Sequence, residues 1–135
     1  MLKKDSKLPM KATNEAAGFD VYSNEIITIP PHSISKISTG ISLQIPNGFY
    51  VKLYDRSSMA MKQIYLRSGV IDSDYTGELY VCLSNNNESE FTIHKNMKIA
   101  QFIVHETVNV QLSTCVEFDK ETERGNGGFG STSFF

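Results

Sequence analysis

Short stretches of alternating apolar and polar residues, separated by turn residues, constrain the fold of this chain more than any other feature. Apolar residues occupy every second position in residues 41–45 and 49–53, and Pro46-Asn47-Gly48 lies between the two stretches. A period of two places successive side chains on opposite faces of a strand, so this pattern predicts a hairpin. Residues 79–83 alternate in the same way and predict another strand.

Shorter apolar or alternating stretches extend this pattern along the chain. They predict strands at residues 26–29, 33–38, 91–93, 98–104, 108–112 and 115–118. The one helical candidate, residues 57–63, is rich in Ala, Met and Lys and is about two turns long. Many short strands with turns between them predict an all-β fold, a jelly-roll-like barrel or sandwich with one short helix.

Composition excludes several classes of protein. The chain has 135 residues and a net charge of −2, which argues against a generally basic nucleic-acid binder. No apolar run approaches the ~20 residues of a membrane-spanning helix, and the N-terminus has no apolar segment typical of a secretory signal. Cys82 and Cys115 each lie in an apolar run, which indicates buried, reduced thiols in a soluble intracellular protein; a single disulfide is the alternative.

The C-terminal end differs from the rest of the chain. Residues 122–135 contain four of the nine glycines and, before the final Phe134-Phe135, only Phe129 to bury. A glycine-rich segment loses much conformational entropy on ordering, so we expect a β domain at 1–121 and a flexible arm at 122–135. The alternative is a disordered end without a function.

Three segments contain groups suited to chemistry. In residues 72–77, Asp72 and Asp74 point the same way if the chain is extended, and one of them is a candidate general base. Alternatively, this is a solvated polar turn. Arg56-Ser57-Ser58 precedes the predicted helix and suits an anion; simple N-capping by either serine is the alternative.

The third segment runs from Arg124 to Thr132. Its glycines let main-chain N–H groups approach a phosphate, Arg124 adds charge, and Phe129 offers a face for stacking a base. It lacks the Gly-Lys-Ser/Thr of a Walker loop. The three histidines have no metal-ligand spacing with one another or with the cysteines.

Five segments in order resemble the motifs of the trimeric dUTPase family, over about residues 12–133. The first four are Ala17-Gly18-Phe19-Asp20-Val21, Asp55-Arg56-Ser57-Ser58, Gly69-Val70-Ile71-Asp72-Ser73-Asp74-Tyr75-Thr76-Gly77 and Lys98-Ile99-Ala100-Gln101-Phe102-Ile103, and the fifth is the segment from Arg124 to Thr132.

The resemblance implies a homotrimer of jelly-roll-like protomers with three shared active sites. Each site takes the third motif from one subunit, the first, second and fourth from a neighbour, and the arm from the remaining one. The implied reaction is hydrolysis of dUTP to dUMP and pyrophosphate, which limits uracil incorporation into DNA and supplies dUMP for thymidylate synthesis. Mg²⁺ is expected on the substrate phosphates and water, without protein ligands, and neither nucleic acid nor membrane is an expected partner.

The resemblance also assigns roles to individual residues. Asp72 matches the base that activates water for attack on the α-phosphorus, and Tyr75 matches the residue that packs under deoxyribose. Main-chain groups of the uracil site match Gly69, Val70, Ile71 and Tyr80. Phosphate ligands match Arg56, Ser57, Ser58, Gln101 and Arg124. In the arm, Phe129 matches the aromatic ring that covers uracil, and Gly130, Ser131 and Thr132 match further substrate-binding positions.

Three departures from the family pattern stand out. Asn96-Met97 replaces the usual Gly-Asp before the basic residue of the fourth motif, Asp55 places an acid beside Arg56, and Ser133 replaces a final glycine before Phe134-Phe135. The alternatives are a dCTP deaminase, which shares an Arg-Ser-Ser segment, a non-catalytic binding module on the same fold, and a β-sandwich interaction domain.

Overall fold

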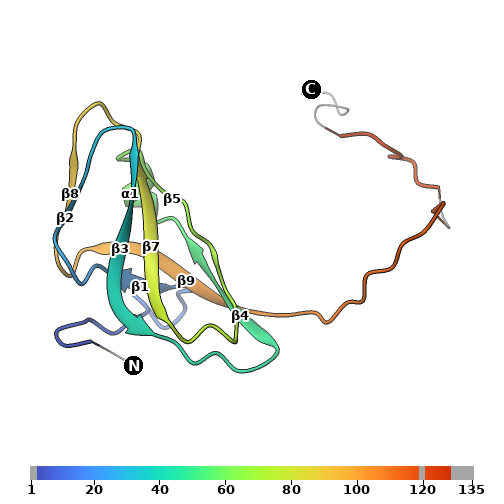
Figure 1. The fold of residues 1–135 in the computed structure, drawn as a ribbon, viewed down its shortest axis with the longest axis horizontal. Coiled ribbons are helices and arrows are strands. Elements are labelled where there is room, and N and C mark those ends of the chain that lie inside the picture. The colour runs from blue at the N-terminus through green and yellow to red at the C-terminus, as the bar shows by residue number, and fades with distance from the viewer. Residues whose placement is uncertain (1–2, 119–120, 129–135) are drawn as a thin grey trace.

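The computed structural model describes residues 3–118 and 121–128, and this part of the chain contains nine strands and one short helix (Figure 1). In chain order the elements are β1 (Phe19–Tyr22), β2 (Ile27–Ile29), β3 (Ser33–Ser42), β4 (Phe49–Tyr54), α1 (Ser57–Ala60), β5 (Ile64–Leu66), β6 (Val70–Ile71), β7 (Glu78–Asn85), β8 (Phe91–Ile93) and β9 (Lys98–Glu106).

The strands form three antiparallel sheets in the described residues. Their orders are β1-β9-β4-β6, β3-β7-β5 and the pair β2-β8. Each order has two ends, so none of these sheets closes on itself into a hydrogen-bonded barrel. The predicted all-β, jelly-roll-like fold is confirmed, in an open-edged form.

The core lies between the two larger sheets. Figure 1 shows β9 passing behind β3 and β7, so the layers cross rather than lie parallel. The inward side chains of β7 are Leu79, Val81 and Leu83, and all three are buried, as the alternation predicts. Ile99 and Phe102 of β9 belong to the same apolar cluster.

The predicted hairpin at residues 41–54 is wrong. β3 ends at Ser42, and residues 43–48 connect it to β4 in a different sheet. Ile41 and Ile45 are buried as their spacing indicates, but Ile41 belongs to β3 and Ile45 faces the core from the crossover connection. β4 instead pairs with β9 and β6. Alternation identifies the buried face of a segment and not its hydrogen-bonding partner.

Two other predictions need correction. The helix is shorter than residues 57–63, since α1 covers Ser57–Ala60 and hydrogen-bonded turns follow it. The stretches 108–112 and 115–118 are not strands, and their apolar side chains are exposed. Figure 1 shows this part of the chain leading away from the sheets, and no strand among the described residues pairs with it.

Both cysteines are free, so the single-disulfide alternative is wrong. Cys82 is half-buried in β7, but Cys115 is exposed in the segment that leaves the sheets, against the prediction of two buried thiols. Within the described residues, no helix has the length and apolar character needed to cross a membrane.

Candidate active site

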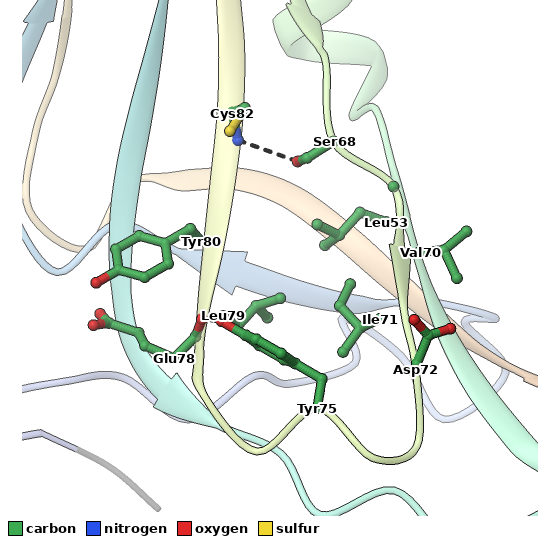
Figure 2. Close-up of a pocket in the computed structure, with 11 residues that line it drawn as sticks. Leu53, Ser68, Val70, Ile71, Asp72, Tyr75, Glu78, Leu79, Tyr80 and Cys82 are labelled. Carbon is green, nitrogen blue, oxygen red and sulfur yellow. Dashed lines mark hydrogen bonds between the residues drawn. The ribbon is translucent and has the colours of Figure 1, made fainter.

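A cavity of about 280 Å³ lies between β6 and β7 (Figure 2). Its lining comes from three strands and the connections around them: Leu53, Ser68, Gly69, Val70, Ile71, Asp72, Tyr75, Glu78, Leu79, Tyr80 and Cys82. It therefore contains the whole predicted base-recognition set, together with the predicted general base and the predicted sugar-packing tyrosine.

The cavity exists because β6 and β7 belong to different sheets. β6 pairs with β4, and the N–H of Leu53 donates to the Gly69 carbonyl at 2.8 Å, so the polar turn at residues 72–77 does not join two paired strands of a hairpin. β7 pairs with β3 along one edge and with β5 only from Leu83 onward along the other. The facing edges of β6 and of the first half of β7 are thus without a partner strand among the described residues.

The far end of the opening between β6 and β7 is closed by two hydrogen bonds. The N–H of Arg67 donates to the Cys82 carbonyl at 2.8 Å, and the N–H of Cys82 donates to the Ser68 hydroxyl at 3.1 Å. The two strands diverge from this point, so main-chain donors and acceptors line a slot with one closed end. Such a slot suits a flat polar ring, which can pair with strand edges as another strand does.

Asp72 stands at the mouth of the cavity, where β6 ends. Its side chain is exposed, and the N–H of Tyr75 donates to its main-chain carbonyl at 3.2 Å, which closes a turn over residues 72–75. Asp74 lies inside this turn and does not line the cavity. The expectation that both carboxylates point the same way is therefore wrong, because the segment turns instead of extending.

Tyr75 is held against the start of β7. Its hydroxyl donates to the Glu78 carbonyl at 2.8 Å, and its ring packs over Gly77. A Cβ on Gly77 would lie 2.6 Å from the Tyr75 hydroxyl oxygen, closer than real Cβ contacts allow. Glycine at position 77 is thus required for the ring to lie at the edge of the cavity.

A second cluster surrounds the buried carboxylate of Asp20 in β1. Arg56 Nε lies 3.1 Å from Asp20 Oδ1, and Lys98 Nζ lies 2.6 Å from Asp20 Oδ2. Arg56 Nη1 also donates to the Lys98 carbonyl and to the Ser58 hydroxyl, each at 3.3 Å. Two cations on one carboxylate leave a net positive charge, and these contacts fix the direction of the Arg56 guanidinium.

The Ser57 and Ser58 side chains are exposed at the start of α1. The N-cap is Arg56, and no side chain caps the helix, so the prediction of N-capping by Ser57 or Ser58 is wrong. The buried Met59 side chain anchors this short helix to the core instead. Both serines remain on the surface, and the Ser58 hydroxyl accepts a hydrogen bond from the Arg56 guanidinium.

Gln101 links the first and second motif segments. Its Nε2 donates to the Asp55 carbonyl at 3.0 Å, and a Cβ on Gly18 would lie 2.7 Å from Gln101 Oε1. The Asp55 carboxylate accepts a hydrogen bond from the N–H of Leu66 at 2.6 Å, so it is turned toward β5. The acid beside Arg56 therefore has a structural partner of its own.

The departure at Asn96-Met97 is explained by local geometry. Asn96 has a φ of +65°, a left-handed conformation that glycine adopts most easily and that asparagine tolerates better than most residues. Its N–H donates to the Ser23 carbonyl, and the Met97 side chain packs against the core. The turn before Lys98 is thus kept without the usual Gly-Asp.

The two clusters stay apart within one chain. The cavity lining in the described residues includes none of Arg56, Ser57, Ser58, Gln101 or Arg124. Arg124 is exposed, and its Nε donates to the Gly127 carbonyl at 2.9 Å. The predicted arm residues Phe129, Gly130, Ser131 and Thr132 lie outside the described residues, as do Ser133, Phe134 and Phe135.

Sequence reasoning assigned no role to Asp20, Lys98 or Glu78. The signal for Asp20 was an acid between Phe19 and Val21 in a short apolar stretch, a position at which a carboxylate is rarely buried unless paired. Glu78 gave no such signal. The described residues contain no group of three His, Cys, Asp or Glu side chains suited to hold a metal ion.

Comparison with known proteins gives a consistent result. The family model described as dUTPase matches residues 4–133. The deoxyuridine 5'-triphosphate nucleotidohydrolase of Candida albicans is 44% identical over 129 residues, covering 93% of this chain and 80% of that protein. The enzyme of the same name from Clostridium tetani is 38% identical over 135 residues, covering 98% of this chain and 92% of that protein.

Solved structures agree with the sequence comparisons. The dUTPase of Staphylococcus bacteriophage 80alpha with dUpNHpp superimposes on this chain with a TM-score of 0.93 and 25% sequence identity. The match covers 98% of this chain and 95% of the phage chain.

Proposed function

This chain belongs to the dUTPase family and is a dUTP diphosphatase that hydrolyses dUTP to dUMP, and we propose that Asp72 is the general base of the reaction. The observation that carries this proposal is the position of Asp72, whose exposed carboxylate lines the mouth of the cavity. A carboxylate there accepts a proton from a water molecule aimed at the α-phosphorus, and pyrophosphate leaves with the electron pair of the broken P–O bond.

Main-chain groups select the base in this proposal. Uracil presents acceptors at O2 and O4 and a donor at N3. The stretches of β6 and β7 that line the cavity, at Gly69, Val70, Ile71 and around Tyr80, supply the complementary groups. Cytosine has a different pattern and leaves buried main-chain groups unpaired, a mismatch that discriminates strongly.

Tyr75 selects the sugar in this proposal. Its ring lies at the cavity edge over Gly77, fixed by the hydrogen bond to the Glu78 carbonyl. A deoxyribose that packs on this ring leaves no room for a 2′-hydroxyl, so ribonucleotides bind poorly.

Arg56, Ser57, Ser58 and Gln101 bind the phosphates in this proposal, with Asp20 and Lys98 holding Arg56 in place. These phosphate ligands do not line the cavity of their own chain. We therefore propose a homotrimer in which the cavity of one subunit meets the Arg56 cluster of a neighbour. The exposed alternating residues Val108, Val110 and Leu112 support this assembly, because a second copy offers them an edge and an apolar surface.

The arm completes the site in this proposal. Arg124 reaches the γ-phosphate, Phe129 covers the base, and Gly130, Ser131 and Thr132 bind the substrate as the arm closes. The substrate is the Mg²⁺ complex of dUTP, in which the metal ion neutralises charge on the leaving pyrophosphate. Phosphate oxygens and water are ligands that suit this metal.

The cellular role that fits this activity is removal of dUTP before its incorporation into DNA, together with supply of dUMP for thymidylate synthesis. The free Cys82 and Cys115 thiols support a soluble intracellular location, in cytoplasm or nucleus, where thiols stay reduced.

Hydrolysis in ¹⁸O-labelled water tests the proposed direction of attack. Attack on the α-phosphorus places the label in dUMP, as mass spectrometry of the products would show. Label in pyrophosphate would contradict the mechanism. A parallel assay with dCTP, read by ammonia release, tests the deaminase alternative and is expected to be negative.

A further inference from the structure

The Glu78 carboxylate is nearly buried at the start of β7, although neither recognition of the nucleotide nor proton transfer uses it. Its side chain is 10% exposed and accepts hydrogen bonds from Lys3 Nζ and the Ser38 hydroxyl at 2.5 Å each, and from the N–H of Gly40 at 2.9 Å. Figure 2 shows the carboxylate on the side of β7 opposite to Ile71 and Asp72.

Two of these donors, Ser38 and Gly40, come from an irregular part of β3. The pairing of β3 with β7 shifts register between Ser38 and Ser42, and Gly40 lies within this bulge with a φ of +70°. A Cβ on Gly40 would lie 2.0 Å from the Ser6 hydroxyl, so glycine is required. The Glu78 carboxylate takes the place of ladder hydrogen bonds that the bulge interrupts, and it fixes the start of β7 to β3.

The N-terminal segment is attached to the same point. The N–H of Lys3 donates to the Gly40 carbonyl at 2.7 Å, while its ammonium group pairs with Glu78. Lys3, β3 and β7 thus meet at one carboxylate, and the main chain of Glu78 is held from the side opposite to the cavity.

The main-chain carbonyl of Glu78 is the acceptor for the Tyr75 hydroxyl, at 2.8 Å. The Tyr75 ring also rests on Gly77, the residue just before Glu78. The position of the ring therefore depends on where the first residue of β7 lies, and the Glu78 side chain determines that position.

We propose that Glu78 is a positioning residue for sugar selection, which acts on Tyr75 through its own main-chain carbonyl. This inference rests on the proposed contact between Tyr75 and deoxyribose. It assigns the dUTP-over-UTP preference partly to a carboxylate that never touches the nucleotide.

The ionisation of Glu78 is consistent with this role. Burial opposes the charged form, but hydrogen bonds from Lys3, Ser38, Tyr80 and Gly40 outweigh it and lower the pKa of Glu78 to about 2. The carboxylate is thus charged at every pH at which the enzyme is assayed, and its hydrogen bonds are charge-assisted.

The test compares kcat and KM for dUTP and UTP in the full-length Glu78→Gln protein. Glutamine keeps the size of the side chain but removes the charge that pairs with Lys3. The ratio of kcat/KM for dUTP to that for UTP is expected to fall about three- to tenfold, as coupling energies between contacting residues allow. Most of the change should come from improved use of UTP. Glu88→Gln is the matched control, because the Glu88 side chain is 94% exposed and pairs with His32.

Tyr75→Phe supplies a double-mutant cycle. This change removes the hydroxyl through which Glu78 acts, so the double variant Tyr75→Phe, Glu78→Gln should lose no more selectivity than the more affected single variant. A purely structural role of Glu78 would give multiplicative losses instead, and that result would overturn the inference.

Lys3→Gln keeps the test decisive if Glu78→Gln does not fold. The Lys3 side chain is 59% exposed, so its replacement removes one donor with little risk to folding, and a smaller loss of selectivity is expected. The Tyr75→Ala protein separates the two levels of the argument. An unchanged dUTP-to-UTP ratio in Tyr75→Ala would remove both the sugar contact and this inference. If the dUTP-to-UTP ratio of kcat/KM falls in Tyr75→Ala but is unchanged in both Glu78→Gln and Lys3→Gln, the role of Glu78 is wrong while the contact between Tyr75 and the sugar stands.

Discussion

β9 and the trailing segment, residues 107–118, are both rich in apolar residues and are both predicted to contain strands, but they lie in opposite environments. β9 pairs with β1 along one edge and with β4 along the other, and Ile99 and Phe102 are buried. In the trailing segment, Val108, Val110 and Leu112 are 78%, 67% and 95% exposed. A strand needs a partner for its N–H and C=O groups as well as an apolar face.

The difference separates the contacts that a single chain makes by itself from the apolar surface that it leaves uncovered. The sheets bury their own apolar residues and build the cavity and the Asp20 cluster from contacts within one chain. The trailing segment leaves apolar side chains in water, each of which would gain about 1.5–3 kcal/mol on full burial. A second copy of the chain is the simplest source of that burial.

Asp72→Asn is expected to have the largest effect. It tests the cavity that the sheets of a single chain form. The variant should lower kcat by about 10²- to 10⁴-fold, because asparagine cannot accept the proton of the attacking water. Binding of a non-hydrolysable dUTP analogue, measured by calorimetry, should stay nearly unchanged. Turnover close to that of the unmodified enzyme would remove Asp72 as the base.

Deletion of residues 123–135 tests the arm. The shortened chain loses Arg124 and the glycine-rich segment, so kcat should fall about 10²- to 10³-fold, as for loss of a transition-state donor. Sedimentation velocity should give the same oligomer as the full chain, because the trailing segment is retained. Full activity after deletion would show that the arm does not close the site.

Val110→Asp and Leu112→Asp test whether a second copy of the chain buries the trailing segment. If a second copy buries these side chains, each change should weaken subunit association by about ten- to a hundredfold, measured by sedimentation at falling protein concentration. Ser113→Asp is the matched control, since it adds the same charge at an exposed polar neighbour. An equal change in subunit association in all three variants would contradict the proposed assembly.

The smallest expected effect is a pH dependence of stability within the sheets. Glu78 has a pKa of about 2 in the folded chain, below its ordinary value of 4.5, so its stabilising contribution is complete above pH 4.5 and is lost as the pH falls toward 2. The charged or titratable groups around it are Lys3, Tyr80 and, near Ser38, Glu25. Urea unfolding at pH 7, 4.5 and 3 measures the free energy of unfolding of the unmodified protein and of Glu78→Gln. The difference between these two free energies should become smaller as the pH falls. A difference in the free energy of unfolding that does not change with pH would argue against stabilisation by the charged Glu78 carboxylate.

Much of the fold was predictable from short apolar or alternating stretches. The strands at β2, β7, β8 and β9 lie where residues 26–29, 79–83, 91–93 and 98–104 predict them. The partners were not predictable, since β4 follows β3 across a short turn but pairs with β9, more than forty residues away. Such pairing depends on the packing of the whole core, which a local pattern does not contain.

The candidate site divides in the same way. Five third-motif residues line one cavity, namely Gly69, Val70, Ile71, Asp72 and Tyr75, whereas Arg56 and Gln101 belong to a separate cluster. Contiguous residues share a local environment, but residues from different motifs meet only through tertiary or quaternary contacts. The boundary between a domain at 1–121 and an arm at 122–135 stays a prediction, and so does the role of Phe129 in covering the base.

The sequence by itself determined the all-β fold class and the chemical groups available, because periodicity and residue type are local properties. The tertiary structure decided that β6 and β7 separate into different sheets and open a slot between them. It also decided that the Glu78 carboxylate meets Lys3 and the β3 bulge. The physical reason is that hydrogen bonds between strand edges, and the burial of a charge among its donors, are satisfied by groups distant in the chain.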